Sequence, residues 1–129
     1  MKPYPSPTRI TLSNIMTTRH AAKRWQERVE DVPLHIAFRN LEYAIQEGIT
    51  IPPRMAWKFH PVLKHHGKKK QARFYVTSGA MIVVRRETMV TVLPFSSEAY
   101  ICVLVWKLFG CLPLEYPEWG RLPVNNINY

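Results

Sequence analysis

The sequence predicts an α+β domain, with two N-terminal helices packed on a four-stranded antiparallel sheet, plus a C-terminal apolar helix and a tail. Three observations lead to this fold class. Apolar residues recur at helical spacing through the first third of the chain. Short β-rich runs separated by turn residues follow in the middle of the chain. A nearly all-apolar segment near the end completes the order of elements.

The length and composition suit a single domain spanning residues 1–129. With 129 residues, of which 47% are hydrophobic, the chain can bury one core. Prolines at positions 3, 5 and 7 exclude a helix at the start, so we expect an extended arm over residues 1–9. The core is expected over residues 10–111. Residues 112–129 contain three prolines and are expected to form a C-terminal tail.

The first predicted helix covers residues 18–29, with Thr17 or Thr18 as its cap. One face is apolar and can be buried, and it consists of Ala22, Trp25 and Val29. A separate stripe gathers titratable and cationic side chains, namely His20, Arg24, Glu27 and Arg28. Two interpretations stay open: a solvated face with an i, i+4 ladder of charges, or a site in which the imidazole and the two arginines bind an anionic substrate.

The second predicted helix begins at Pro33, because a proline in the first helical turn loses no hydrogen bond. Its apolar stripe follows the spacing i, i+4, i+7, i+11 and consists of Leu34, Phe38, Leu41 and Ile45. Gly48 is a natural C-terminal cap, and the Pro52-Pro53 pair ends any remaining helix. We expect the amphipathic helices to bury their stripes on one face of the sheet.

Four strands are predicted between residues 55 and 94. Residues 55–60 alternate in polarity and are assigned to the first strand, which would put Lys58 and His60 on one face. An exposed basic loop at residues 65–70 is followed by the other strands, at residues 71–77, 80–85 and 88–94. Ser78-Gly79 and Arg86-Glu87 supply the two turns. The nearly all-apolar run 80–85 predicts a central strand that is buried on both faces.

The last predicted helix is capped by Ser96 or Ser97 and ends before Gly110. Its apolar run begins at Ala99 and ends at Phe109. A helix that is apolar nearly all round is either buried in the core or forms an interface with a protein partner or a second copy. This segment is therefore the predicted location of a protein partner or homodimer interface.

The expected compartment follows from the chain start, the apolar runs and the cysteines. No signal peptide opens the chain, and the apolar runs fall short of the ~20 residues that a membrane-spanning helix needs. Cys102 and Cys111 would lie ~13 Å apart along one helix, which is too far for a disulfide, so we expect buried thiols in a reducing compartment. We therefore expect a soluble, cytoplasmic protein that makes no membrane contact.

The charge balance indicates what kind of partner the protein binds. Lys plus Arg number 18 against 9 acidic residues, which gives a formal net charge of +9. This surplus favours polyanionic partners: RNA or other nucleic acid, an acidic protein, or an anionic membrane surface. The charge says nothing about the fold.

The residue types present are sufficient for metal-independent cleavage of RNA. Attack by the 2′-hydroxyl needs a base, an acid for the leaving 5′-oxygen, and fixed positive charge beside the pentavalent phosphorane. Histidine and tyrosine can exchange protons, and arginine binds phosphate oxygens with two donors. His65 and His66 are adjacent and would point apart on a strand, and the cysteines lack zinc-site spacing. We therefore expect neither a metal nor another cofactor.

Residues 18–29 resemble the opening of a group of small bacterial and phage domains with the pattern T-x-H-A-x-x-R-x-x-E-R-x. The matching residues are Thr18, His20, Ala21, Arg24, Glu27 and Arg28. Thr91-Val92-Leu93 resembles the T-V-hydrophobic element of that group's last strand. The group is DUF4258-like and belongs with the RelE, barnase and colicin E5/D type of small ribonuclease-toxin fold. The resemblance implies that His20, Arg24 and Thr91 form the polar centre of the site, with Arg28 nearby.

The leading hypothesis is a toxin-type, metal-independent endoribonuclease that cleaves by 2′-OH transphosphorylation. Its catalytic candidates are His20, Arg24, Tyr75 and Thr91. Its nucleic-acid-binding candidates are Arg28, Lys58, His60, Lys68, Lys69, Lys70 and Arg73. Two alternatives stay open: a non-catalytic nucleic-acid-binding protein, and a phage-type inhibitor that binds an acidic host target through the apolar helix.

The same residues also have structural explanations. His20 can hydrogen-bond a strand residue and hold the first helix on the sheet, since buried polar groups need partners. Arg24 and Arg28 can form surface ion pairs with neighbouring carboxylates such as Glu27. The three lysines at 68–70 can form an ordinary solvated loop, although they would still strengthen salt-sensitive attraction to phosphates.

Overall fold

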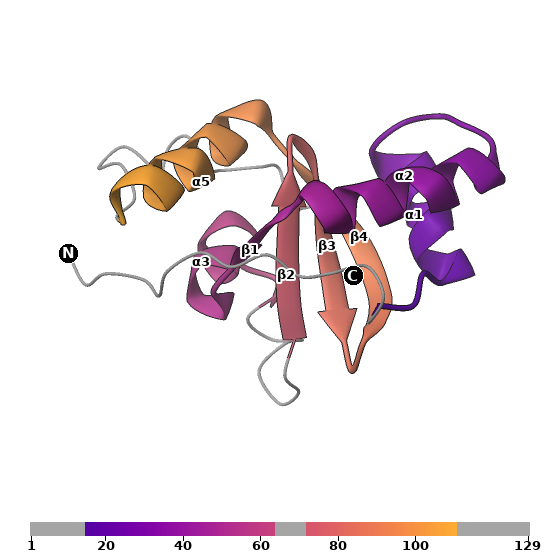
Figure 1. The fold of residues 1–129 in the computed structure, drawn as a ribbon, viewed down its shortest axis with the longest axis horizontal. Helices are drawn as coiled ribbons and strands as arrows, with labels where there is room; N and C mark the ends of the chain where they lie inside the picture. The colour runs from indigo at the N-terminus through magenta and orange to yellow at the C-terminus, as the bar shows by residue number, and fades with distance from the viewer. Residues whose placement is uncertain (1–14, 64–71, 111–129) are drawn as a thin grey trace.

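A computed structural model of the chain describes residues 15–63 and 72–110 and confirms the α+β class (Figure 1). Its helices and strands follow one another in the order α1 Arg19–Arg28, α2 Leu34–Glu47, β1 Ile49–Ile51, α3 Pro53–Phe59, β2 Ala72–Thr77, β3 Gly79–Arg85, β4 Thr88–Phe95 and α5 Ser97–Phe109. The three helices predicted from the sequence are all present, as α1, α2 and α5.

The four strands form an antiparallel sheet in the order β1-β2-β3-β4. β4 is an edge strand, which suits Pro94, because proline has no N–H to donate to a neighbouring strand. β3 lies inside the sheet and is buried on both faces, as its apolar run predicted. A register shift between Val83 and Val84 marks a bulge opposite residues 89–91 of β4.

The prediction of a strand at residues 55–60 was wrong, because this segment belongs to helix α3. Pro53 occupies the first helical turn, where its fixed φ favours a helix start. Met55, Ala56 and Phe59 then fall on one buried face at helical spacing. The fourth strand is instead β1, which directly follows α2 and pairs with β2.

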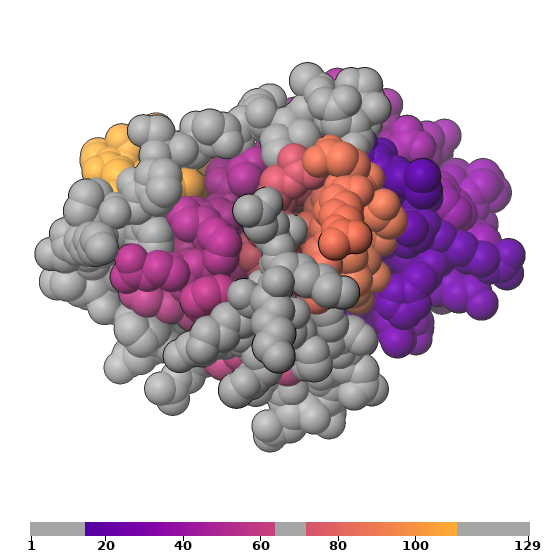
Figure 2. Space-filling view, turned by 90° about the horizontal axis from the view of Figure 1, so that it is seen from below, coloured from indigo at the N-terminus to yellow at the C-terminus, as the bar shows by residue number. Residues whose placement is uncertain are grey.

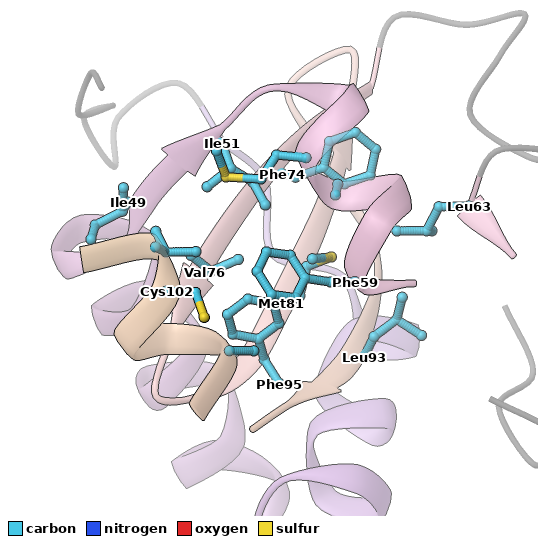
Figure 3. Close-up of a cluster of buried hydrophobic side chains, with 14 of the residues drawn as sticks. Ile49, Ile51, Phe59, Leu63, Phe74, Val76, Met81, Leu93, Phe95 and Cys102 are labelled. Carbon is cyan, nitrogen blue, oxygen red and sulfur yellow. The ribbon is translucent and has the colours of Figure 1, made fainter. Parts of the chain in front are cut away.

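The apolar stripes of α1 and α2 are buried together against one face of the sheet, as the sequence predicted, and helices cover the opposite face as well. α1 and α2 lie on one side of the sheet and α3 and α5 on the other (Figure 1). Each side has its own buried cluster. The α1/α2 cluster includes Trp25, Leu41 and Ile82, whereas the α3/α5 cluster includes Phe59, Phe95 and Trp106, with the two phenylalanine rings 4.8 Å apart (Figure 3).

Backbone hydrogen bonds join the segment before α1 to the start of β4. The Met16 N–H donates to the Glu87 carbonyl (2.6 Å), and the Met89 N–H donates to the Met16 carbonyl (2.9 Å). The Thr18 hydroxyl donates to the Met89 carbonyl (2.9 Å) and accepts from the Ala21 N–H (3.1 Å), which confirms Thr18 as the helix cap. The first turn of α1 is therefore held at the end of β4 that adjoins the β3–β4 turn.

The ends of α2 and α5 use glycine for different reasons. Gly110 follows α5 with a left-handed φ of 79°, the conformation expected of a glycine cap. Gly48 is the C-cap of α2 but has an extended conformation (φ −69°). Glycine is needed there because a Cβ at position 48 would lie 2.4 Å from the Ala44 carbonyl oxygen.

α5 is a core helix with an exposed apolar end. Ser96 caps it, and its inner face consists of Ala99, Cys102, Val103 and Trp106. Burial raises the pKa of the Cys102 thiol, and Cys111 lies outside the described residues. The outer face leaves three large apolar side chains exposed, Ile101, Leu108 and Phe109. The predicted protein partner or homodimer contact at this helix remains a prediction.

Candidate functional site

The polar stripe of α1 lies beside β4, the last strand of the sheet. His20 is solvent-exposed in the first turn of the helix, and Arg24 and Arg28 follow one and two turns later. Arg24 donates Nη1 to the Glu27 carboxylate (3.2 Å), whereas its Nε atom is buried and has no hydrogen-bond partner among the described residues. Arg28 donates Nη1 to the Val92 carbonyl of β4 (2.9 Å).

Two guanidinium groups thus share this edge with one carboxylate. Burial lowers the pKa of Arg28, the Arg24 charge lowers it further, and Glu27 raises it. The two guanidinium groups thus carry like charges close to one another on the same helix face. An anion placed between them would relieve their repulsion, so the α1 stripe is electrostatically suited to a phosphate.

His60 approaches the same edge strand from the other side of the sheet. Its ring is fully buried at the end of α3, and Nε2 lies 2.7 Å from the Pro94 carbonyl oxygen, to which it donates. Burial lowers the pKa of His60, the hydrogen bond to the Pro94 carbonyl raises it, and the Arg28 charge lowers it. His60 therefore supplies no exposed positive charge, while Lys58, its expected neighbour on a strand face, is exposed on helix α3.

We expect His60 to make the protein less stable in mild acid. Its folded-state pKa lies below the ordinary histidine value of 6.5, so the unfolded chain binds more protons than the folded protein as the pH falls below this value. The contribution of neutral His60 to the free energy of unfolding is thus present above pH 6.5 and is lost as the pH falls below it. Urea unfolding between about pH 7.5 and about pH 5 should show a smaller pH dependence for His60→Gln than for the wild type. His35→Gln, which alters an exposed α2 residue, should retain the wild-type dependence; an unchanged slope for His60→Gln would contradict this account.

A second polar cluster lies where β2 begins and the β3–β4 turn closes. Arg73 of β2 forms an ion pair with Glu87 of that turn. Tyr75 is fully buried on the same face of β2, and its hydroxyl has no hydrogen-bond partner among the described residues. Burial raises the pKa of Tyr75 to about 12, Arg73 lowers it, and Glu87 raises it. Tyr75 is therefore neutral at physiological pH and cannot act as a base there.

Thr91 does not meet the α1 stripe. It is buried on β4 opposite Val83, and directly opposed residues in an antiparallel pair project to the same face of a sheet. Val83 belongs to the α3/α5 cluster, so Thr91 faces away from α1 and His20. The Thr91 hydroxyl also has no hydrogen-bond partner in the described part of the chain.

The remaining predictions concern lysines, metals and membranes. Lys68, Lys69 and Lys70 lie outside the described residues. Within residues 15–63 and 72–110, no three His, Cys, Asp or Glu side chains gather in a way that could hold a metal ion. The helices in these two ranges are all too short or too polar to cross a membrane.

Sequence reasoning missed Glu87 as a polar group of this region. Its position was correctly assigned to a two-residue turn, but the turn assignment carried no information about its side chain. A signal was present, because Arg-Glu is an unusual choice for a tight hairpin turn, which favours Asn-Gly. The ion pair with Arg73 becomes apparent only when the turn is seen beside β2.

Comparison with known proteins identifies the family. Residues 17–96 match the Halo_toxin family model, a toxin domain of the RelE superfamily. The matched span contains the α1 stripe and the Arg73–Glu87 cluster, and it ends immediately before α5. No curated protein and no solved structure matches the chain. The narrower DUF4258-like assignment is not confirmed by this match, but the wider superfamily is: the chain belongs to the Halo_toxin family of RelE superfamily toxin domains.

Proposed function

We propose that the protein is a toxin-type endoribonuclease that cleaves RNA by attack of its own 2′-hydroxyl, without a metal ion. The observation that carries this proposal is the α1 stripe, where an exposed imidazole precedes two arginines at the edge of the sheet. On an α-helix, His20 and Arg24 lie ~6 Å apart along the axis, and Arg28 lies ~6 Å further. This spacing is close to that of successive phosphates in an RNA strand.

The side chains of the stripe have complementary roles in this proposal. His20 takes the proton of the attacking 2′-hydroxyl and returns it to the leaving 5′-oxygen, because it is the only exposed imidazole on the stripe among the described residues. Arg24 binds the reacting phosphate through donors that Glu27 does not occupy. Arg28 is fixed by its hydrogen bond to Val92 and presents positive charge at the next position. Tyr75 and Thr91, which are both buried, are assigned no contact with substrate.

The test is incubation of the purified protein with RNA in the presence of a chelator. The proposal predicts cleavage products that carry a 2′,3′-cyclic phosphate on one fragment and a 5′-hydroxyl on the other. It also predicts that a fully 2′-O-methylated RNA of the same sequence resists cleavage, since it lacks the attacking hydroxyl. Products with 5′-phosphate ends, or cleavage of the methylated RNA, would contradict the proposed chemistry.

A second candidate function is RNA binding without catalysis. The burial of Tyr75, Thr91 and His60 favours it, since it leaves His20 as the one exposed proton-transfer candidate among the described site residues. This alternative predicts binding that weakens steeply with salt and survives replacement of His20. Cleavage that depends on His20 would exclude it.

A further inference from the structure

The Arg73–Glu87 ion pair lies at an accessible end of the sheet. The side chains of Arg73 and Glu87 are 34% and 52% exposed, so solvent and ligands can reach both partners. Exposed ion pairs contribute little to stability, because their charges are well solvated when apart. Stability therefore does not explain why these two charges are held together.

The turn that carries Glu87 is strained. Arg86 and Glu87 have φ angles of 48° and 63°, in the left-handed region that residues other than glycine seldom adopt. Both turn positions carry charged residues with β-carbons, although Asn-Gly would suit this two-residue turn better. The strained backbone positions the Glu87 carboxylate on Arg73 and its carbonyl on the Met16 N–H.

The same turn lies beside the start of α1. The hydrogen bonds from Met16 to Glu87 and from Thr18 to Met89 hold the first turn of the helix, which carries His20, at this end of β4. Figure 2 shows this end of the sheet at the surface, directly next to α1. Buried below it on β2, the Tyr75 hydroxyl has no hydrogen-bond partner among the described residues. An RNA strand bound along the α1 stripe would therefore pass close to Arg73.

We propose that Arg73 forms a second phosphate subsite and that Glu87 is its internal counter-ion, which an RNA phosphate displaces. This inference rests on the proposed function, because it takes RNA as the ligand. The Glu87 carboxylate occupies the place on the guanidinium that a phosphate oxygen would take. Its negative charge then weakens RNA binding in the free protein.

Removing the counter-ion should tighten RNA binding. Two unit charges about 5 Å apart at a solvated surface repel by an amount that corresponds to a three- to fivefold change in affinity. We therefore expect Glu87→Gln to lower the Kd for a short 2′-O-methyl RNA about three- to fivefold. Glu42→Gln, which makes the same charge change on the exposed face of α2, should change the Kd less than twofold. Glu87→Gly also removes the carboxylate, so it should bind RNA as tightly as Glu87→Gln. Because glycine relieves the left-handed strain, Glu87→Gly should unfold at a higher temperature than Glu87→Gln.

A double-mutant comparison connects the effect to Arg73. In a protein that already carries Arg73→Gln, the further change Glu87→Gln should no longer tighten binding beyond the twofold effect of the control. An equal gain with and without Arg73, or no gain for Glu87→Gln at all, would overturn the counter-ion role. A cleavage rate at saturating RNA that falls more than tenfold in Glu87→Gln with unchanged binding would also overturn it. Failure of the wild type to cleave RNA would refute the proposed enzyme, whereas the binding results would still decide the subsite.

Discussion

Replacing His20 by alanine is expected to slow RNA cleavage by a factor of about 10²–10⁴, the usual contribution of a positioned general acid or base. His20 is exposed in the first turn of α1, on the same stripe as Arg24 and Arg28. Its loss removes the proton-transfer group but neither of the arginines. RNA affinity should therefore change by less than about threefold, and the defect should appear in the cleavage rate at saturating RNA. Single-turnover cleavage together with the Kd for 2′-O-methyl RNA would separate these two effects.

His35→Ala provides the matched control for this prediction. His35 is likewise an exposed helical histidine, but it lies on α2 and outside both polar clusters. The His35→Ala variant should cleave RNA at the wild-type rate. Equal cleavage rates for His20→Ala and the wild type would remove His20 from the mechanism.

Replacing Trp106 by alanine should lower the free energy of unfolding by about 3–5 kcal/mol, the range measured when large aromatic side chains are removed from a core. Trp106 is 1% exposed and belongs to the α3/α5 cluster, together with Phe59 and Phe95. The loss would come from the removed apolar surface and from the cavity left between α5 and the sheet. Urea unfolding followed by circular dichroism would measure it.

Leu108→Ala is the corresponding control, since it shortens a side chain on the same helix that is 76% exposed. It should change stability by less than about 0.5 kcal/mol. The comparison tests whether α5, which lies beyond the matched toxin domain, is part of the same cooperative unit. If Trp106→Ala cost no more than Leu108→Ala, α5 would be an appendage to an independently stable core.

Local signals in the sequence were sufficient to predict most of the elements. The helical spacing of apolar residues identified α1 and α2, and side-chain capping by Thr18 and Ser96 set the starts of α1 and α5. The apolar run of β3 and the turn at 86–87 were also recognised, because these features depend on neighbouring residues. The error at α3 arose because the short alternating run at residues 55–60 fits a strand as well as a short helix.

Long-range relations could not be predicted in the same way. The sequence shows that side chains alternate along β4, but not which face of the sheet α3 and α5 cover, so the burial of Thr91 was missed. His60 was expected on the surface of a strand, whereas it ends a helix and is buried against Pro94. The α1 stripe was recognisable because helical periodicity alone places His20, Arg24 and Arg28 in line.

In the function proposed above, the α1 stripe and the Arg73–Glu87 cluster form one RNA-binding surface around the start of β4. The most direct measurement is an NMR titration of the isotopically labelled protein with a short 2′-O-methyl RNA. The largest backbone amide shifts should fall within α1 and within the turn that joins β3 to β4. Shifts concentrated on α5 or on the exposed face of α2, with α1 unchanged, would contradict this proposal.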